Sequence, residues 1–286
     1  MNIAFLILAH QYPGQLKALV DALLHYHGSK VFIHVDAKSE ELYTEIKTAY
    51  ANRDRVVLLE KRYPVYWGSY NQIQATISLL RSARGRGDYY CLLSGQDMPV
   101  KKVETYAEFL KKENKEFISW FQLPDSQWSG GGLNRLHYYS IDVPNHAYLS
   151  NKLNRIINKV QRILGYKRKI SGTFYGGPNW FNLSNAAVEY VCRYLDTHPS
   201  YLKQFTYTRC ADEIVIQSIL LNSEFKSRVI SKDLRVIDWA SGPEYPRVWR
   251  KEDFERLIHS EAGFFARKFN EQIDPDIIQL LKQHVS

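Results

Sequence analysis

The sequence has little cysteine and no long apolar run. Its three cysteines, Cys91, Cys192 and Cys210, are widely spaced and odd in number, which argues against a disulfide framework and a cysteine-based metal site. The apolar run at residues 3–9 is far shorter than the ~20 residues that span a bilayer, and no basic segment precedes it. These absences predict a cytoplasmic protein whose first apolar run is a buried strand.

The common nucleotide and metal motifs are also missing. There is no G-x-x-x-x-G-K-[ST] loop and no G-x-G-x-x-G after the first apolar run, so kinase-like and dinucleotide-binding proteins lose their support. Asp274-Pro275-Asp276 matches the D-x-D metal-binding pattern. However, Asp followed by Pro before an apolar periodic run is typical of a helix N-cap, so no metal site is predicted.

Basic and aromatic residues are plentiful. The net charge of +8 and a pI near 9.2 favour anionic partners such as nucleic acid, nucleotide-sugar phosphates or an acidic membrane surface. No zinc-finger, RNP-like or helix-turn-helix pattern accompanies the charge, which makes nucleic acid a minor option. The 20 Tyr and 6 Trp exceed what a core needs, and aromatic clefts often bind sugars or bases.

Strand and helix patterns alternate through the first hundred residues. Apolar runs at 2–9, 31–36, 56–59 and 89–97 predict strands, and helical periodicity predicts helices at 13–27, 39–50 and 70–83. Short connections between such elements indicate one α/β domain with a mainly parallel sheet flanked by helices. Ligands of such sheets lie beyond the carboxyl ends of the strands. We therefore expect Asp36, the turn at 63–69 and S-G-Q-D-M-P at 94–99 to gather there.

The middle of the chain is less regular. The Trp- and Gly-rich loop at 120–135 is a plausible rim for a substrate. Residues 148–165 predict an amphipathic basic helix, followed by K-R-K at 167–169. An apolar stripe facing the core, with a solvated basic back, is the favoured interpretation, and a membrane-surface helix is the alternative. The stripe comprises Leu149, Leu153, Ile156, Val160 and Ile163, and the basic side comprises Lys152, Arg155, Lys159 and Arg162.

Several motifs occur in the order found in one enzyme family. They are I-H-V-D-A-K-S (33–39), V-Y-W-G-S-Y-N-Q-I-Q-A (65–75), L-L-S-G-Q-D-M-P-V-K (92–101), G-G-P-N-W-F-N-L-S (176–184), A-D-E (211–213) and F-A-R-K-F (265–269). In these motifs the chain resembles the core-2/I-branching glycosyltransferases, glycosyltransferase family fourteen, which also includes the peptide O-xylosyltransferases. The resemblance covers roughly residues 3–280.

The resemblance implies a GT-A-like fold formed by a single glycosyltransferase domain over residues 1–286. About 1–105 would form the nucleotide-sugar-binding half, and about 106–286 the acceptor-binding and catalytic half. The implied reaction moves a sugar from a UDP-sugar to a glycan hydroxyl with inversion, giving a β-linkage, without a divalent metal or other cofactor. The donor sugar is expected to be GlcNAc or xylose, and the sequence does not choose between them.

Motif positions assign the site residues. The resemblance makes Glu213 of A-D-E the catalytic base, whereas Asp212 is expected to start the following helix through capping and the helix dipole. The base would deprotonate the attacking hydroxyl, while basic residues stabilise the leaving UDP in place of a metal. The expected donor-site residues are Asp36, Asp97, Arg247 and Lys268. The expected acceptor-side residues are Trp239, Trp180 and Arg135.

The chain departs from the animal members of this family. It lacks their N-terminal membrane anchor and their disulfides, which predicts a bacterial relative that builds capsule, exopolysaccharide or lipopolysaccharide on lipid-linked acceptors. The basic helix at 148–169 would then contact anionic lipid at the inner membrane face. A non-catalytic carbohydrate- or nucleotide-binding protein on the same scaffold is the alternative function. The intact A-D-E, with Arg247 and Lys268, argues against it, and a nucleic-acid binder is less favoured still.

Overall fold

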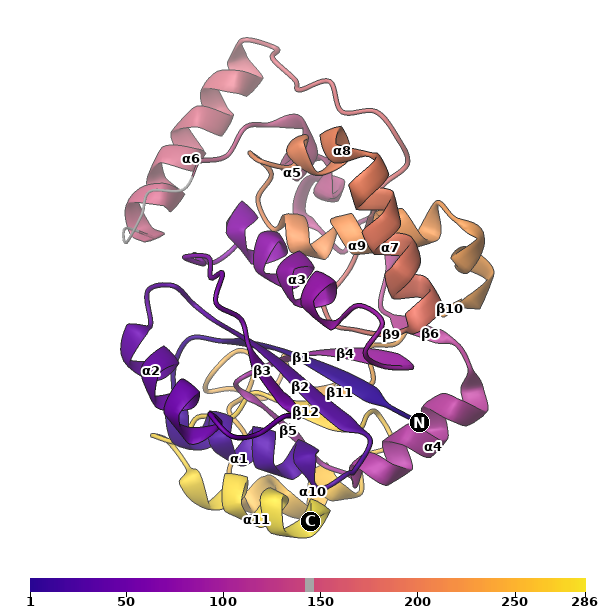
Figure 1. The fold of residues 1–286 in the computed structure, drawn as a ribbon. Coiled ribbons are helices and arrows are strands. Elements are labelled where there is room, and N and C mark those ends of the chain that lie inside the picture. The colour runs from indigo at the N-terminus through magenta and orange to yellow at the C-terminus, as the bar shows by residue number, and fades with distance from the viewer. Residues whose placement is uncertain (142–146) are drawn as a thin grey trace.

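The computed structural model describes residues 1–141 and 147–286, and its centre is a seven-stranded sheet (Figure 1). Every strand runs in the same direction except β9, which is antiparallel to both of its neighbours. In spatial order the strands are β10 (Val229–Ile230), β6 (Glu116–Ile118), β9 (Phe181–Ser184), β4 (Tyr89–Ser94), β1 (Ile3–Ala9), β2 (Ser29–Val35) and β3 (Val56–Leu58). The sheet is thus mainly parallel, and the predicted α/β fold class is confirmed.

Helices cover both faces of this sheet. Alternate residues of a strand point to opposite faces, so in β1 Phe5 and Ile7 pack into one core while Ala4 and Leu6 pack into the other. The first core is closed by α1 (Pro13–Leu24), α2 (Glu40–Ala49), α4 (Val103–Glu113), α10 (Phe254–Ile258) and α11 (Pro275–Val285). The second is closed by α3 (Tyr70–Ala83), α7 (Asn185–Thr197) and α9 (Val215–Leu221). Burial on both faces explains the continuous apolar runs in the sequence.

Two small sheets and several short helices complete the fold. One sheet joins β11 (Arg235–Ile237), β12 (Phe265–Arg267) and β5 (Asp97–Pro99), and the other joins β7 (Phe121–Gln122) and β8 (Tyr175–Gly176). The remaining α-helices are α5 (Leu133–His137), α6 (Ala147–Ile163) and α8 (Pro199–Lys203). Single 3₁₀ turns occupy Ser129–Gly132, Ala211–Glu213, Glu224–Arg228 and Lys251–Asp253. The β5–β12 pairing brings the C-terminal quarter beside the carboxyl end of β4.

Helix termini follow the local signals in the sequence. The predicted helix at 70–83 coincides with α3, and the side chain of Ser184 caps α7 by accepting a hydrogen bond from the N–H of Ala187. Asp274 caps α11 by accepting one from the N–H of Ile277, so the capping interpretation of Asp274-Pro275-Asp276 is confirmed. Strands from both sides of residue 105 share the central sheet, and the division into two functional halves stays a prediction.

Helix α6 contradicts the prediction of a core-facing apolar stripe. Its buried side chains include Asn154 and Gln161, whereas Leu149, Ile156 and Val160 are exposed. The buried amides bond the backbone of residues 139 and 141, and these polar contacts determine which side of the helix faces the protein. Within the described residues, no helix combines the length and the apolar character that a membrane crossing requires.

Candidate active site

Asp36 lies at the carboxyl end of β2, where the sequence predicts a ligand site. Its carboxylate accepts hydrogen bonds from the N–H of Lys38 (2.8 Å), the Lys38 ammonium (2.9 Å) and the N–H of Val65 (3.2 Å). The Lys38 ammonium also lies 4.1 Å from the centre of the Tyr66 ring. Asp36 therefore ties the turn at 63–69 to the edge of the sheet and holds a cation there.

His10 follows β1, and charged groups from several parts of the chain influence its pKa. His10 is exposed to solvent, yet desolvation by the protein around it is the largest influence and lowers the pKa of its imidazole; Asp36 opposes this, and Lys268, Arg267 and Lys38 lower the pKa further. These effects act only over short distances. Backbone contacts place the C-terminal F-A-R-K-F motif beside the carboxyl ends of β4 and β1, because the N–H of Phe269 donates to the carbonyl of Gln96 (2.9 Å) and the N–H of Gly95 donates to that of Leu8 (2.9 Å).

Asp97 is fully buried between two arginines. One of its oxygens accepts a hydrogen bond from Arg267 (3.0 Å), and the other accepts from the N–H of Ser94 (3.1 Å) and lies 3.5 Å from Arg235. Both guanidinium carbons lie 4.8 Å from the centre of the Trp180 ring. A buried carboxylate with such partners orients its arginines. Direct contact between Asp97 and a donor stays a prediction.

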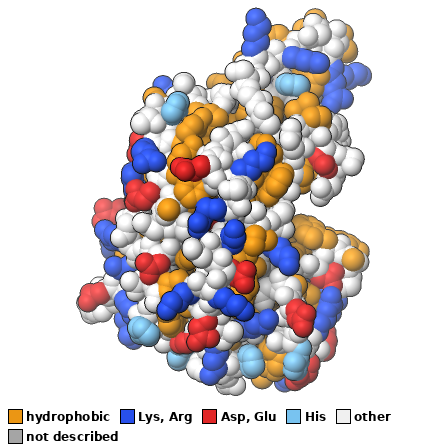
Figure 2. Space-filling view, turned by 90° about the vertical axis from the view of Figure 1, so that its right-hand side faces the viewer, with side chains coloured by type: hydrophobic (Ala, Val, Ile, Leu, Met, Phe, Trp, Pro, Cys, Tyr) orange, Lys and Arg blue, Asp and Glu red, His pale blue; other side chains and the backbone are white. Residues whose placement is uncertain are grey.

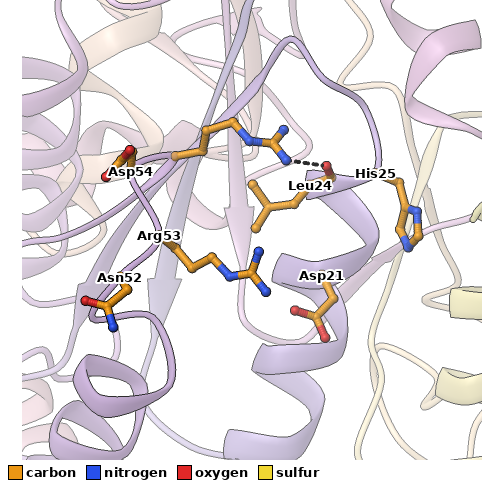
Figure 3. A pocket seen from close by; sticks show the side chains of 7 residues that line it. Asp21, Leu24, His25, Asn52, Arg53 and Asp54 are labelled. Carbon is orange, nitrogen blue, oxygen red and sulfur yellow. Dashed lines mark hydrogen bonds between the residues drawn. The ribbon is translucent and has the colours of Figure 1, made fainter.

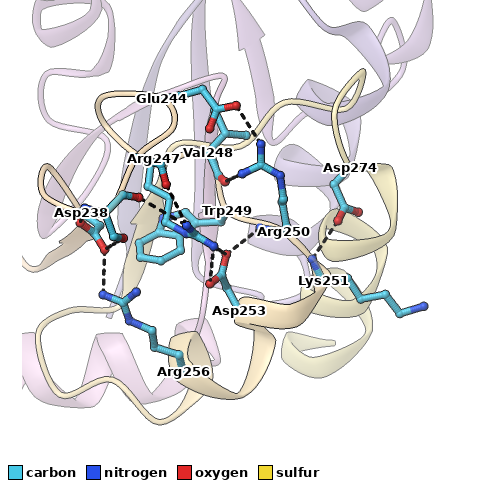
Figure 4. A network of polar contacts seen from close by, with 12 residues as sticks. Asp238, Glu244, Arg247, Val248, Trp249, Arg250, Lys251, Asp253, Arg256 and Asp274 are labelled. Carbon is cyan, nitrogen blue, oxygen red and sulfur yellow. Dashed lines mark hydrogen bonds and ion pairs between the residues drawn. The ribbon is translucent and has the colours of Figure 1, made fainter.

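Lys268 and Arg247 have different surroundings, although their backbones are hydrogen-bonded. Arg247 forms a bidentate pair with Asp253, with both N–O distances 3.1 Å, and donates to the carbonyls of Ser241 and Gly242 (Figure 4). The half-buried Lys268 has no side-chain hydrogen bond to any described residue, and burial, together with Arg267, lowers its pKa. Lys268 is therefore the better placed of the two to meet an anionic ligand.

Glu213 lies in the 3₁₀ turn before α9, with its side chain 32% exposed. Its Oε2 accepts a hydrogen bond from Arg135 at 2.6 Å, and the Arg135 guanidinium lies 3.6 Å from the centre of the Trp128 ring. Trp128 and Arg135 thus hold the carboxylate in one orientation. Within the described part of the chain Oε1 has no protein partner, so it is the oxygen that a substrate hydroxyl could reach.

Asp212 does not start a helix as predicted. Helix α9 begins at Val215 with no side-chain cap, and Asp212 is buried with an Oδ1 that has no hydrogen-bond partner among the described residues. Burial, and secondarily the charge of Glu213, raises its pKa to about 7. The 3₁₀ turn points Asp212 inward and leaves Glu213 at the surface, which sequence spacing alone does not reveal.

Two segments connect Glu213 to the cationic edge of the sheet. The carbonyl of Gly68, in the turn held by Asp36, accepts a hydrogen bond from the N–H of Cys210 (2.8 Å). Gly68 has φ of 74°, and an added Cβ there would lie 3.1 Å from the Cys210 sulfur, so both backbone and space favour glycine.

The second segment is G-P-N-W at 177–180. The N–H of Gly177 donates to the carbonyl of Glu213 (3.1 Å), and three residues later Trp180 packs on Arg267. Three residues of extended chain span at most about 11 Å. The candidate base and the arginine of the F-A-R-K-F motif are therefore held at the two ends of one short segment.

The two predicted acceptor-side tryptophans have opposite exposures. Trp239 is 65% exposed and lines a surface hollow of about 550 Å³ together with Ser241 and Arg256. Trp180 is 9% exposed and is in contact with two guanidinium groups. Trp239 has an open ring face for a sugar, whereas Trp180 has the surroundings of a residue that supports the arginines.

The hollow of Figure 3, about 490 Å³, lies elsewhere. It is lined by Asp21, Leu24 and His25 of the end of α1 and by residues 52–55, which precede β3. These residues are at the amino edge of the parallel strands, and none of the predicted site residues lines this hollow. We assign no function to it.

Comparison with known families identifies the chain. A family model described as "Core-2/I-Branching enzyme" matches residues 3–259. The chain belongs to the Core-2/I-Branching enzyme family. This is the family that the ordered motifs predicted.

Curated relatives of this Core-2/I-Branching enzyme are named xylosyltransferases. Xylosyltransferase 2 of Rattus norvegicus and of Homo sapiens are each 27% identical over 310 residues, and Xylosyltransferase of Ciona intestinalis is 23% identical over 304. The alignments cover 98–100% of this chain and 34% of each relative. The chain thus spans about a third of the length of these proteins.

Two solved structures are also similar to this family member. The bifunctional glycosyltransferase WbbM matches with a TM-score of 0.42 at 10% identity, over 93% of this chain and 45% of that one. Mouse xyloside xylosyltransferase 1 matches with a TM-score of 0.40 at 8% identity, over 93% and 97%.

Sequence reasoning missed several residues of the site in this Core-2/I-Branching enzyme. The sequence did not single out His10, Lys38 or Arg235. It indicated Arg267, next to Lys268 and between phenylalanines, as a partly buried cation but did not assign it to the donor site. Arg235 lies in β11 and reaches Asp97 and the carbonyl of Leu92. The apolar residues that follow Arg235 indicate a strand but no contact with Asp97. That contact arises because β11 pairs with β12, which in turn pairs with β5.

Proposed function

We propose that this glycosyltransferase transfers its sugar from a UDP-sugar with inversion and without a divalent metal, forming a β-linkage. Glu213 is the base that removes the proton of the acceptor hydroxyl. Lys268, with Arg267 beside it, stabilises the negative charge that develops on the leaving UDP. Asp36, Lys38 and the turn at 63–69 form the donor side of the site.

One observation carries this proposal. The segment 177–180 contacts Glu213 at one end and the arginine pair at the other. A single in-line displacement needs a base on one side of the anomeric carbon and positive charge beside the departing diphosphate, and a connecting segment that spans at most about 11 Å keeps the two within one site. Preorganised charges act most strongly where they need not move during the reaction.

The donor sugar in this proposal is xylose or GlcNAc. The name of the curated relatives favours xylose, including a peptide O-xylosyltransferase-like activity, and the resemblance of the motifs also implies GlcNAc. We propose a hydroxyl of a glycan or lipid-linked oligosaccharide as the acceptor, in bacterial surface polysaccharide synthesis. The protein would then work in the cytoplasm, at the inner face of the membrane. The exposed ring of Trp239 supports a sugar as the acceptor.

The test is a hydrolysis screen across UDP-sugars with EDTA present, read by released UDP. We expect turnover of UDP-xylose or UDP-GlcNAc that EDTA leaves unchanged. Activity that disappears in EDTA and returns with Mn²⁺ would overturn the metal-free mechanism. Hydrolysis confined to sugars on another nucleotide would overturn the donor assignment.

A further inference from the structure

Helix α6 is attached to the protein through polar side chains. The amide of Asn154 donates to the carbonyl of Ile141 and accepts from its N–H, both at 2.8 Å. Gln161 forms the same pair of bonds with Tyr139, at 2.8 and 3.2 Å. Beyond the helix, the buried Arg168 bonds Thr208 (3.0 Å) and the carbonyl of Gln204. These contacts hold the helix in a defined orientation.

The outward side of α6 is apolar. Five of the seven exposed Leu, Ile and Val side chains among the described residues lie between 149 and 164. Their exposed fractions are 41% for Leu149, 52% for Ile156, 48% for Val160, and 74% for Ile163 and Leu164. Apolar side chains at such spacing normally face a core. Here their removal from water requires a partner outside the described fold.

Charge identifies the partner. Residues 149–169, which we call the basic arm, contain seven Lys and Arg and no Asp or Glu. The rest of the chain, with 31 basic and 30 acidic residues, is nearly neutral. Lys152, Arg155, Lys159 and Arg162 lie along one flank of the apolar side. Blue and orange side chains without red ones also gather at the top of Figure 2, the height at which Figure 1 places the C-terminal end of α6.

We propose that the basic arm docks onto an anionic lipid surface, inserting the apolar side of α6 among acyl chains while its basic flank meets the headgroups. An apolar side and a basic flank are the two features of amphipathic helices that lie in the interface of an anionic membrane. A second copy of the chain fits poorly, because pairing two apolar sides would bring two segments of charge +7 together. Nucleic acid would pair with the cations but would leave the aliphatic side chains of α6 exposed to water.

Docking would also orient the active site. The segment that holds α6 bonds residues 204–208, since the N–H of Ser140 donates to the carbonyl of Tyr207 and Arg168 bonds Thr208. Glu213 lies five residues further along the chain. A bound membrane would therefore lie near the acceptor side, where a lipid-linked glycan could enter. This last step rests on the proposed function, whereas lipid binding does not.

The test measures co-sedimentation of the full chain with phosphatidylcholine vesicles, with and without phosphatidylglycerol. We expect binding to the anionic vesicles only, and at least a tenfold loss of binding in the triple variant Ile156→Ser, Val160→Ser, Ile163→Ser. The matched control is Ile273→Ser, which alters an exposed isoleucine outside the arm. Circular dichroism establishes that each variant is folded.

Other outcomes would overturn the proposal. If the wild type does not sediment with the anionic vesicles, the basic arm does not dock onto lipid. If the triple variant sediments as well as the wild type, the protein binds the vesicles through charge alone and the apolar side of α6 does not insert. Light scattering without lipid would show whether the wild type is a dimer. If it is, and if the triple variant is a monomer, a second copy of the chain rather than lipid covers the apolar side of α6. Glu213→Gln should bind vesicles like the wild type, so a failed mechanism and a failed docking surface remain distinguishable.

Discussion

Two regions of the molecule bury polar groups in opposite ways. One is the sheet edge with Asp36 and Asp97, and the other is the basic arm. At the sheet edge, charged groups are buried only with partners, as in the Asp97 carboxylate between Arg235 and Arg267. In the arm, neutral amides are buried against backbone and the aliphatic side chains face outward. The first arrangement is complete within the chain and suits a rigid catalytic site. The second is incomplete within the described residues and indicates an external surface.

The largest expected effect concerns the base. Glu213→Gln keeps the size and the Arg135 contact of the side chain but cannot take a proton, so we expect kcat to fall about 10³-fold or more. The measurement is sugar transfer under saturating donor. Glu224→Gln, at an exposed glutamate of a neighbouring turn, is the control. Wild-type turnover in the Glu213 variant would remove this assignment.

A second comparison separates two adjacent cations. Lys268→Met removes a charge without a described partner, so we expect kcat/KM to fall about 10²-fold with little change in Tm. Arg267→Met leaves the buried Asp97 with one cation, so it should lower both activity and the free energy of unfolding, the latter by about 2–3 kcal/mol. Thermal denaturation beside the kinetic assay distinguishes them. Equal Tm losses would show that Lys268 is structural.

The buried Asp212 predicts a pH effect on stability. Because its folded pKa is raised to about 7, folding favours the neutral carboxyl. That stability is fully present below the unfolded pKa near 4 and is lost as pH rises toward 7. The side chain of Asp212→Asn cannot ionise, so the free energy of unfolding of this variant relative to the wild type should rise by about 4 kcal/mol between pH 4 and pH 8. Denaturant unfolding at both pH values measures this, and a pH-independent difference would contradict it.

The smallest effect tests the arm directly. Ile156→Ser alters a side chain 52% exposed, and we expect less than about 0.5 kcal/mol of destabilisation in the absence of lipid. The same change at Ile77, only 2% exposed in α3, should cost more than about 3 kcal/mol. Urea denaturation compares the two. A large loss at Ile156 would mean that the arm has a partner within the chain.

Local patterns predicted those parts of the fold that depend on local physics. The alternation of strand and helix, the bounds of α3 and the cap at Asp274 follow from apolar periodicity and N-cap chemistry. The orientation of α6 could not be predicted in this way. Periodicity finds the apolar side of a helix, but whether that side faces the protein depends on distant hydrogen bonds, here to residues 139 and 141.

The candidate site also has some features that the sequence predicts and others that depend on tertiary packing. The sequence by itself determined the enzyme family and the candidate residues, because ordered motifs survive in the chain whatever its packing. Only the tertiary structure decided that Asp212 points inward while Glu213 stays accessible, that Arg247 is paired with Asp253 and that Lys268 has no side-chain partner among the described residues. The physical reason is that burial and ion pairing are properties of groups brought together from distant positions, such as Asp97 and Arg267, which no local pattern encodes.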